Sequence, residues 1–291
     1  MLKESTVPLR MLLAGLLLAV SAVIAHAQAP AADDDEQLLN EVFQTDLVYP
    51  QDRGEVQITI GPRHMSNGDD ADEIGIEIEY GITDKWEVFG EWDPFTRVRL
   101  DSGDTVKGPG DVELGTQYSF MHIHGTNNHV AIGVSVDLPT GSIDKGLTEG
   151  LVEINPYLAL AHDFPGLHRM QLFGSIGVNL VHRARTAAPV EGDDEDAADE
   201  PIADPHDFLL NIGCFVPVRK IRFTAEWNWV NNQWNNAGTN SEIYATPGIV
   251  WVPSRHWEFG VGVPIGLTRD SSNAQIVGTI IYEFDTRHDK E

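Results

Sequence analysis

Carboxylate side chains occur at nearly every second position of the stretch EIGIEIEYGITDKWEVFGEW, which runs from Glu73 to Trp92. Closely spaced carboxylates can serve as a general acid and base, can bind divalent cations, or can line a pore that prefers cations. Apolar residues fill the alternate positions, and a period of two is typical of β-strands. The available chemistry therefore depends on whether the acidic face or the apolar face of these strands points inward.

Motifs that would support catalysis are missing from the sequence. It contains no G-x-S-x-G, H-E-x-x-H or Walker pattern, and the glycines around Ser175 in FGSIG have the wrong spacing for a nucleophile. Charged residues in the wall of a pore are more often solvated than catalytic. We therefore assign no catalytic residue and no cofactor.

Candidate metal ligands are few. His122, His124 and His129 lie close together in MHIHGTNNH, but a structural zinc site needs four ligands, so we interpret this stretch as a solvated turn. The acidic run Asp193–Asp196 offers oxygen ligands for divalent cations, although a flexible solvated loop is the interpretation we favour. Cys214 is the single cysteine, which excludes an internal disulfide and indicates an unreactive buried or lipid-facing thiol. We predict no metal site.

The first residues have the features of a secretory signal peptide. Lys3 and Arg10 precede an apolar run, which is followed by the small-x-small cleavage pattern AHA. We predict cleavage before Gln28, which removes residues 1–27, and a cut after Ala29 is the alternative. The apolar run is too short for a permanent membrane anchor.

The charge of the chain limits the classes of partner. The sequence holds 45 Asp and Glu residues against 19 Lys and Arg residues, a formal net charge of −26. Nucleic acid needs a basic protein face, so it is excluded as a partner. After the signal peptide no segment is continuously apolar over the roughly 20 residues of a membrane-spanning helix, so insertion into a membrane would require strands.

Alternation after residue 53 predicts an all-β fold. We predict a transmembrane up-and-down antiparallel β-barrel of about twelve strands over residues 54–284, followed by a tail at 285–291. One all-β domain accounts for this length. The predicted strands are Glu55–Arg63, Glu73–Gly81, Trp86–Asp93, Asp111–Phe120, His129–Leu138, Val152–Ala161, Arg169–His182, Phe208–Val216, Ile221–Asn231, Glu242–Trp251, Trp257–Leu267 and Gln275–Phe284.

The connections between these strands alternate in length. Those after the even-numbered strands are short or moderate, as at 82–85, whereas those after the odd-numbered strands are mostly longer. The connection at 183–207 contains the acidic stretch EGDDEDAADE at 191–200. Short turns at one end and long loops at the other are typical of outer-membrane barrels, whose short turns face the periplasm. A soluble sandwich gives no reason for this asymmetry.

Aromatic residues collect near the predicted strand ends, on the apolar face. Two belts of amphipathic rings at the height of the lipid headgroups are typical of membrane barrels, although aromatic residues favour strands in any protein. The predicted girdles comprise Tyr80, Trp86, Trp92, Tyr118, Phe120, Trp227, Trp229, Trp251, Trp257, Tyr282 and Phe284.

Together these features favour a barrel in the bacterial outer membrane over a secreted soluble β-protein, in which the inner and outer faces would be exchanged. In the barrel the carboxylates line the lumen and the isoleucines face lipid. Arg222 is among the few predicted lumen-facing cations. The predicted lumen-facing acids are Glu77, Glu79, Glu87, Glu91, Glu113, Asp137, Glu153, Glu226 and Glu258.

Residues 28–53 form an acidic segment that precedes the barrel. In it Leu38, Leu39, Val42 and Phe43 recur at helical spacing behind three aspartates, which suits the start of an amphipathic helix. A short helix at the periplasmic mouth and a disordered acidic tail are both compatible with this segment.

Five stretches carry a family resemblance: EYGITDKWEVFG at Glu79–Gly90, GPGDVELGTQYSF at Gly108–Phe120, VSVDLPTG at Val134–Gly141, YATPGIVW at Tyr244–Trp251 and VGVPIGL at Val261–Leu267. They resemble the outer-membrane family described as meta-pathway phenol-degradation proteins, or as transporters, over nearly all of the chain after Glu55. The resemblance implies a barrel that passes or binds small, often aromatic or otherwise hydrophobic compounds, and it supplies no catalytic residue. The acidic stretch at 191–200 departs from the family pattern.

We expect a passive channel or uptake protein that selects small solutes by lumen width and lumen charge rather than by chemistry. The alternative is a structural or surface-interaction barrel without a transport role, and a barrel hydrolase that uses lumen carboxylates is a third, weaker one. The expected partners are outer-membrane lipid, small-molecule solutes and the outer-membrane assembly machinery. Because the chain extends beyond Phe284, that machinery would have to recognise Tyr282 and Phe284 internally.

Overall fold

A computed structural model of the chain describes residues 37–66, 71–99, 103–183, 206–231 and 240–287. The predicted signal peptide and the acidic stretch at 191–200 lie outside these residues. The strands are β1 (Glu55–Ser66), β2 (Ala71–Thr83), β3 (Trp86–Arg99), β4 (Thr105–Gly108), β5 (Val112–Phe120), β6 (Asn128–Leu138), β7 (Leu151–Phe164), β8 (Met170–Arg183), β9 (Asp207–Val218), β10 (Ile221–Asn231), β11 (Ser241–Ser254), β12 (Trp257–Gly262), β13 (Ile265–Gly266) and β14 (Ala274–Asp285).

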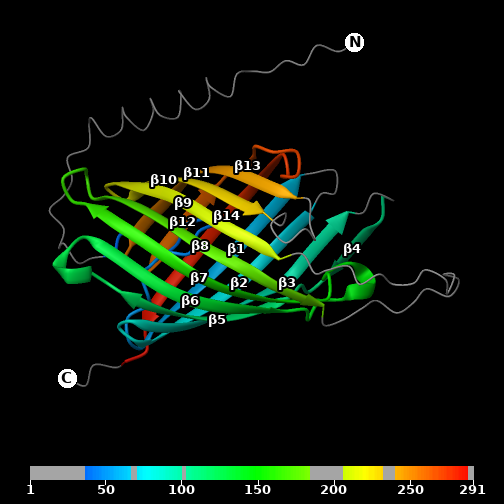
Figure 1. Ribbon diagram of the computed structural model, residues 1–291, viewed down its shortest axis with the longest axis horizontal. Coiled ribbons are helices and arrows are strands. Elements are labelled where there is room, and N and C mark those ends of the chain that lie inside the picture. Colours follow the sequence, from blue (N-terminus) through cyan, green and yellow to red (C-terminus); the bar gives the residue numbers. More distant parts are fainter. Residues whose placement is uncertain (1–36, 67–70, 100–102, 184–205, 232–239, 288–291) are drawn as a thin grey trace, which may run out of the picture.

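The strands form a closed barrel with twelve positions in its wall. Each strand pairs with its neighbours in antiparallel fashion, and the pairing of β1 with β14 closes the sheet (Figure 1). The short strands β4 and β13 add no further position to the wall. Strand β4 pairs with β3, as β5 does, and β13 pairs with β11 and β14, as β12 does. Each short strand therefore extends the position of its longer neighbour. The predicted barrel is confirmed.

The two rims of the barrel differ in their connections. Residues 84–85, 219–220 and 255–256 link strand pairs at one end, which we call the short-turn rim. At the other end, the long-loop rim, the connections include residues 139–150 and 184–206. Helical structure in the described part of the chain consists of two short 3-10 turns, η1 (Ile123–Gly125) and η2 (Ile143–Lys145). Among the described residues, no helix is long and apolar enough to cross a bilayer.

The two faces of the wall are inverted relative to a soluble protein. Gln57 and Ser119 point inward and are fully buried, whereas the side chains of Ile78 and Ile132 on the outer face are 51% and 56% exposed. The period-two pattern sends polar residues to one face and apolar residues to the other. An apolar outer face is stable against lipid and unstable against water.

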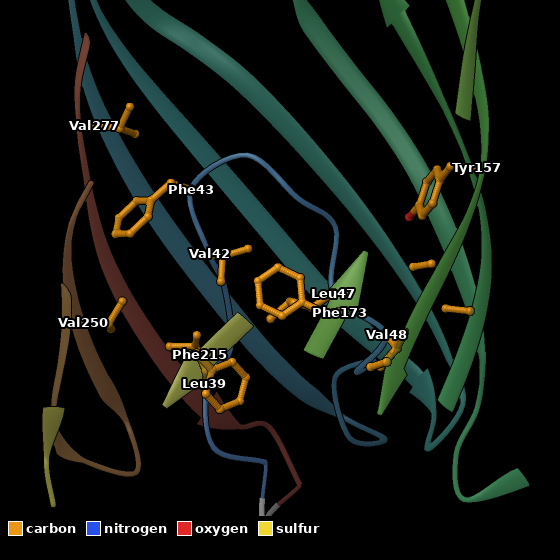
Figure 2. Packing of buried hydrophobic residues seen from close by; sticks show 13 residues of the cluster. Leu39, Val42, Phe43, Leu47, Val48, Tyr157, Phe173, Phe215, Val250 and Val277 are labelled. Carbon is orange, nitrogen blue, oxygen red and sulfur yellow. The ribbon is translucent and has the colours of Figure 1, made fainter. Parts of the chain in front are cut away.

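Residues 37–53 fold back into the lumen, and we call them the seated segment. They contain neither helix nor strand, which differs from both a helix at the mouth and a disordered tail. Figure 2 shows this segment rising inside the wall and turning back. Its apolar side chains Leu39, Val42, Phe43, Leu47 and Val48 are buried against wall residues that include Ala131, Ala159, Ala161, Phe173, Phe215, Val250 and Val277.

Three glycines on β11 and β12 form a slot for the ring of Phe43. A Cβ atom at Gly262 would lie 2.6 Å from two ring carbons of Phe43, and one at Gly260 would lie 3.0 Å from Cε1. A Cβ atom at Gly248 would overlap the same ring. The ring can approach the backbone this closely only because these positions lack side chains.

Candidate lumen site

A cavity of about 470 Å³ remains inside the barrel beside the seated segment. Its wall comes from β1, β2, β3, β5, β6, β7 and β14, and residues 40–47 and Tyr49 supply the remaining side. Among the described lining residues, Arg63 is the one cationic side chain. The lining carboxylates are Glu41, Asp46, Glu73, Glu77, Glu79, Glu87, Glu91, Asp93, Asp111, Glu113 and Asp137.

The predicted lumen acids occupy three places. Glu153 lines a second cavity of about 360 Å³ near the long-loop rim, together with Glu149, Asp207 and Glu242. Glu226 and Glu258 are buried and bind the seated segment. The other six line the first cavity: Glu77, Glu79, Glu87, Glu91, Glu113 and Asp137.

Glu226 on β10 binds the seated segment through both carboxylate oxygens. The backbone N–H groups of Phe43 and Gln44 donate to Oε1 and Oε2, each at 3.0 Å, and the hydroxyl of Thr45 donates to Oε2 at 2.8 Å. Backbone N–H groups that are removed from water need acceptors, and hydrogen bonds to a charged carboxylate are stronger than neutral ones. The wall therefore supplies the acceptors that a helix would have supplied within the segment itself.

Other predicted lumen residues bind the same segment. The backbone N–H of Asn40 donates to Oε1 of Glu258 at 3.2 Å, and the N–H of Gln51 donates to Oε2 of Glu87 at 2.8 Å. The predicted cation Arg222 is buried, and its Nε donates to the carbonyl of Leu38 at 2.6 Å. These side chains hold the protein's own chain inside the lumen.

Glu41 adds a carboxylate to the acidic wall. Its Oε1 accepts hydrogen bonds from Nε2 of Gln57 at 2.5 Å and from the hydroxyl of Thr59 at 2.6 Å. Carboxylate oxygens of Glu41, Glu77 and Glu79 lie within 4.8 Å of one another. Like charges this close repel one another strongly where water is scarce.

Burial changes the acidity of two carboxyls of the seated segment, which lies outside the membrane-spanning strands. It raises the pKa of Glu41 from 4.5 to about 7, although the hydrogen bonds from Thr59 and Gln57 oppose this shift. Burial, followed by repulsion from Glu113, raises the pKa of Asp46 from 3.8 to about 6. Removing the charged form from water explains both shifts.

A hydrogen-bond network fixes the end of the seated segment near the short-turn rim. His129 is fully buried, and its Nδ1 accepts the backbone N–H of His122 at 3.1 Å. Its Nε2 therefore carries the proton and donates to Oδ2 of Asp163 at 2.8 Å. Nε2 of Gln171 donates to Oδ1 of Asp163 at 2.6 Å and to the hydroxyl of Tyr49 at 2.5 Å. His129 thus serves as a structural residue.

The predicted girdle residues lie on the outer face. Eight of them are exposed, namely Tyr80, Trp86, Trp92, Tyr118, Phe120, Trp251, Trp257 and Tyr282, and Trp227, Trp229 and Phe284 are half-buried. At the short-turn rim the ring of Tyr282 lies 4.6 Å from that of Trp257 and 5.7 Å from that of Phe284, measured between centroids. Such a cluster suits the boundary between lipid and water.

Sequence reasoning missed the role of residues 37–53 inside the lumen. Two signals point to it in retrospect. Gly248, Gly260 and Gly262 leave a gap on the inner face that needs a side chain from elsewhere. The second signal is the run of apolar residues around Phe43, because such side chains need a buried apolar surface, and they find it against inward-facing residues such as Phe173 and Val250.

Comparisons with known proteins show the fold. No protein-family model and no curated protein matches the sequence. The chain is similar to the crystal structure of the COG4313 outer membrane channel from Pseudomonas putida F1, with a TM-score of 0.62 and 12% identity over 84% of this chain and 100% of that one. It is also similar to the transport unit of the autotransporter AIDA-I from Escherichia coli, with a TM-score of 0.51 and 11% identity over 91% of this chain and 97% of that one.

The protein is a β-barrel of the bacterial outer membrane. The closed wall satisfies its backbone groups internally, and its apolar outer face suits lipid. The short turns of such barrels face the periplasm, so we expect the seated segment to enter the lumen from the periplasmic side.

Proposed function

We propose that the protein is an outer-membrane channel for small solutes and that its acidic lumen favours cations and neutral molecules over anions. The seated segment narrows the path. The observation that supports this proposal is the composition of the 470 Å³ cavity, whose lining has eleven carboxylates and one guanidinium among the described residues. Carboxylates arranged around a pore attract cations and repel anions, and a wall of low dielectric concentrates their field.

The side chains that line the cavity also favour one chemical class of solute. The family resemblance implies aromatic or otherwise hydrophobic compounds, and the rings of Phe43, Phe89 and Tyr157 do line the cavity. The carboxylates outnumber these rings, so a purely apolar solute would have to displace water from charged groups, which is unfavourable. A small organic cation with an apolar part would contact both kinds of side chain favourably.

The reversal potential of the purified protein in a planar bilayer tests this proposal. In a KCl gradient we expect a cation-selective sign, and we expect the variant Glu77→Gln/Glu79→Gln/Glu91→Gln to shift the potential toward zero. The matched control Asp52→Asn/Asp84→Asn/Asp285→Asn removes the same number of charges outside the cavity lining and should leave selectivity unchanged. Selectivity should also weaken at 1 M salt, where the screening length falls to about 3 Å. An anion-selective pore would overturn the proposal.

A second candidate function rests on the seated segment itself. A lumen filled by residues 37–53, and bound to them by Glu226 and Glu258, suits a barrel that has a structural or surface-interaction role. Deleting residues 38–50 distinguishes the two functions. A channel should conduct more strongly after the deletion, whereas a deletion variant that folds and does not conduct would favour the second role.

A further inference from the structure

Charged residues form a row across four strands on the outer face near the long-loop rim. His64 of β1 lies opposite Asp72 of β2, Asp72 lies opposite Arg97 of β3, and Arg97 lies opposite Lys107 of β4. We call these four residues the rim row. Adjacent strands are about 4.8 Å apart, so the row is a continuous strip of side chains that crosses the four strands at right angles to their direction.

The alternation of β2 and β3 places the rim row on the lipid side of the wall. Thr96 is buried inside, whereas Phe95 before it is exposed on the outer face. Arg97 follows Phe95 by two residues and therefore shares its face, about 7 Å further along the strand. In the same way, Asp72 shares the outer face with Ile74, which is exposed and lies opposite Phe95. The row thus lies just beyond the edge of the apolar band.

The rim row together with Arg99 carries more cationic than anionic side chains. Asp72 accepts a hydrogen bond from Nδ1 of His64 at 2.7 Å and forms an ion pair with Arg97. Arg99 lies one step beyond the row, on the same face as Arg97, and both Arg99 and Lys107 are exposed. Among the described residues, Arg97, Arg99 and Lys107 therefore lie with Asp72 on this face, and Asp104 directly precedes β4, in a chain with a net charge of −26. Asp72 also orients the guanidinium of Arg97.

The location of this cluster at the edge of the apolar band indicates which ligand it can bind. The exposed rings of Trp92 and Phe95 lie next to it on β3, where aromatic rings meet the headgroup region. Headgroups of the outer leaflet carry phosphates, and guanidinium and ammonium groups bind phosphate. We propose that Arg97, Arg99 and Lys107 bind the phosphates of lipopolysaccharide in the outer leaflet.

This site goes beyond the proposed channel function, and its test is independent of conductance. Native mass spectrometry of the folded protein in detergent would measure binding of lipid A that carries its phosphates and of the same lipid after dephosphorylation. We expect the phosphorylated lipid to bind more tightly. The variant Arg97→Gln/Arg99→Gln/Lys107→Gln should weaken that binding by about tenfold or more, as expected from the loss of at least one hydrogen bond to a charged group.

The control variant Arg53→Gln/Lys85→Gln/Arg255→Gln removes three cations at the opposite rim and should bind phosphorylated lipid A as the native chain does. Heat-dependent mobility on gels confirms that each variant is folded. If the triple variant does not fold, Lys107→Gln alone is used, since Lys107 lies outside the Asp72 ion pair. Equal binding of the two lipids by the native chain, or equal weakening by the variant and its control, would refute the site.

Discussion

Glu226 illustrates what a carboxylate in the lumen can do in this protein. A sequence pattern places it on the inner face of β10, but only the structure shows that it accepts two consecutive backbone N–H groups and a hydroxyl from residues 43–45. An acid in this position stabilises a chain segment rather than a solute. The inner-face acids therefore have two roles: Glu226 binds the seated segment, most of the others line the cavity, and Glu79 and Glu87 do both.

Two carboxyls of the seated segment make its position depend on pH. The pKa of Glu41 is about 7 in the lumen and 4.5 in water, and that of Asp46 is about 6 against 3.8. A raised pKa means that the seated state favours the protonated form. Seating is therefore most stable at low pH and weakens as the pH rises from about 4 through about 7.

We expect hydrogen exchange of the backbone amides of residues 40–45 to show this change. After correction for the intrinsic effect of pH, protection should be about tenfold or more lower at pH 8 than at pH 5. The variant Glu41→Gln/Asp46→Asn should show little pH dependence, and Asp84→Asn, outside the lumen, should behave as the native chain does. Protection that rises with pH would contradict this assignment.

At the scale of elements, the seated segment packs against strands β11 and β12 where the ring of Phe43 enters the slot formed by three glycines. The variant Gly262→Ala introduces a methyl group whose three nearest neighbours are all ring atoms of Phe43. Because packed groups tolerate such overlap poorly, we expect Gly262→Ala to unseat the segment, and conductance in planar bilayers to increase.

Gly61→Ala provides the matched control. It also adds a methyl group to the inner face, but the nearest atom lies 4.0 Å away, an ordinary contact distance. Gly61→Ala should therefore leave conductance unchanged. Equal conductance of the two variants would show that the slot does not hold the segment.

Most strands of the wall were predictable from sequence because their side chains alternate with a period of two. In β3 a bulge between Trp92 and Phe95 breaks this period, and the strand continues to Arg99, beyond the predicted end at Asp93. The short strand β4 was not predicted, since Pro109-Gly110 separates it from β5. The residues of β13 lie within the predicted strand Trp257–Leu267, but the break at Val263-Pro264 that separates β13 from β12 was missed. The place of residues 37–53 was not predictable either. Its spacing of apolar residues fits a helix, and its actual partners, such as Glu226, lie more than 180 residues further along the chain.

At the scale of the whole molecule, the asymmetry of the two rims predicts the orientation in the membrane. A protease site inserted at 193–200 should be cut on intact cells, because we expect the long loops to face outward. A site inserted at 83–85, in a turn of the short-turn rim, should be protected until the outer membrane is opened. The folded protein should also migrate differently on gels before and after boiling. Protection of both sites on intact cells would reject this orientation.

The distribution of the seated segment's partners has a consequence for the order in which the protein assembles. Residues 40–51 bind Glu87 on β3, Glu226 on β10 and Glu258 on β12. Asn40 and Glu258 are separated by 218 residues, and contacts over such separations form slowly, because loop closure has a high entropic cost. The complete set of acceptors exists only when the last strands have joined the first. The part of the described chain that is synthesised first is therefore the part that reaches its final position last.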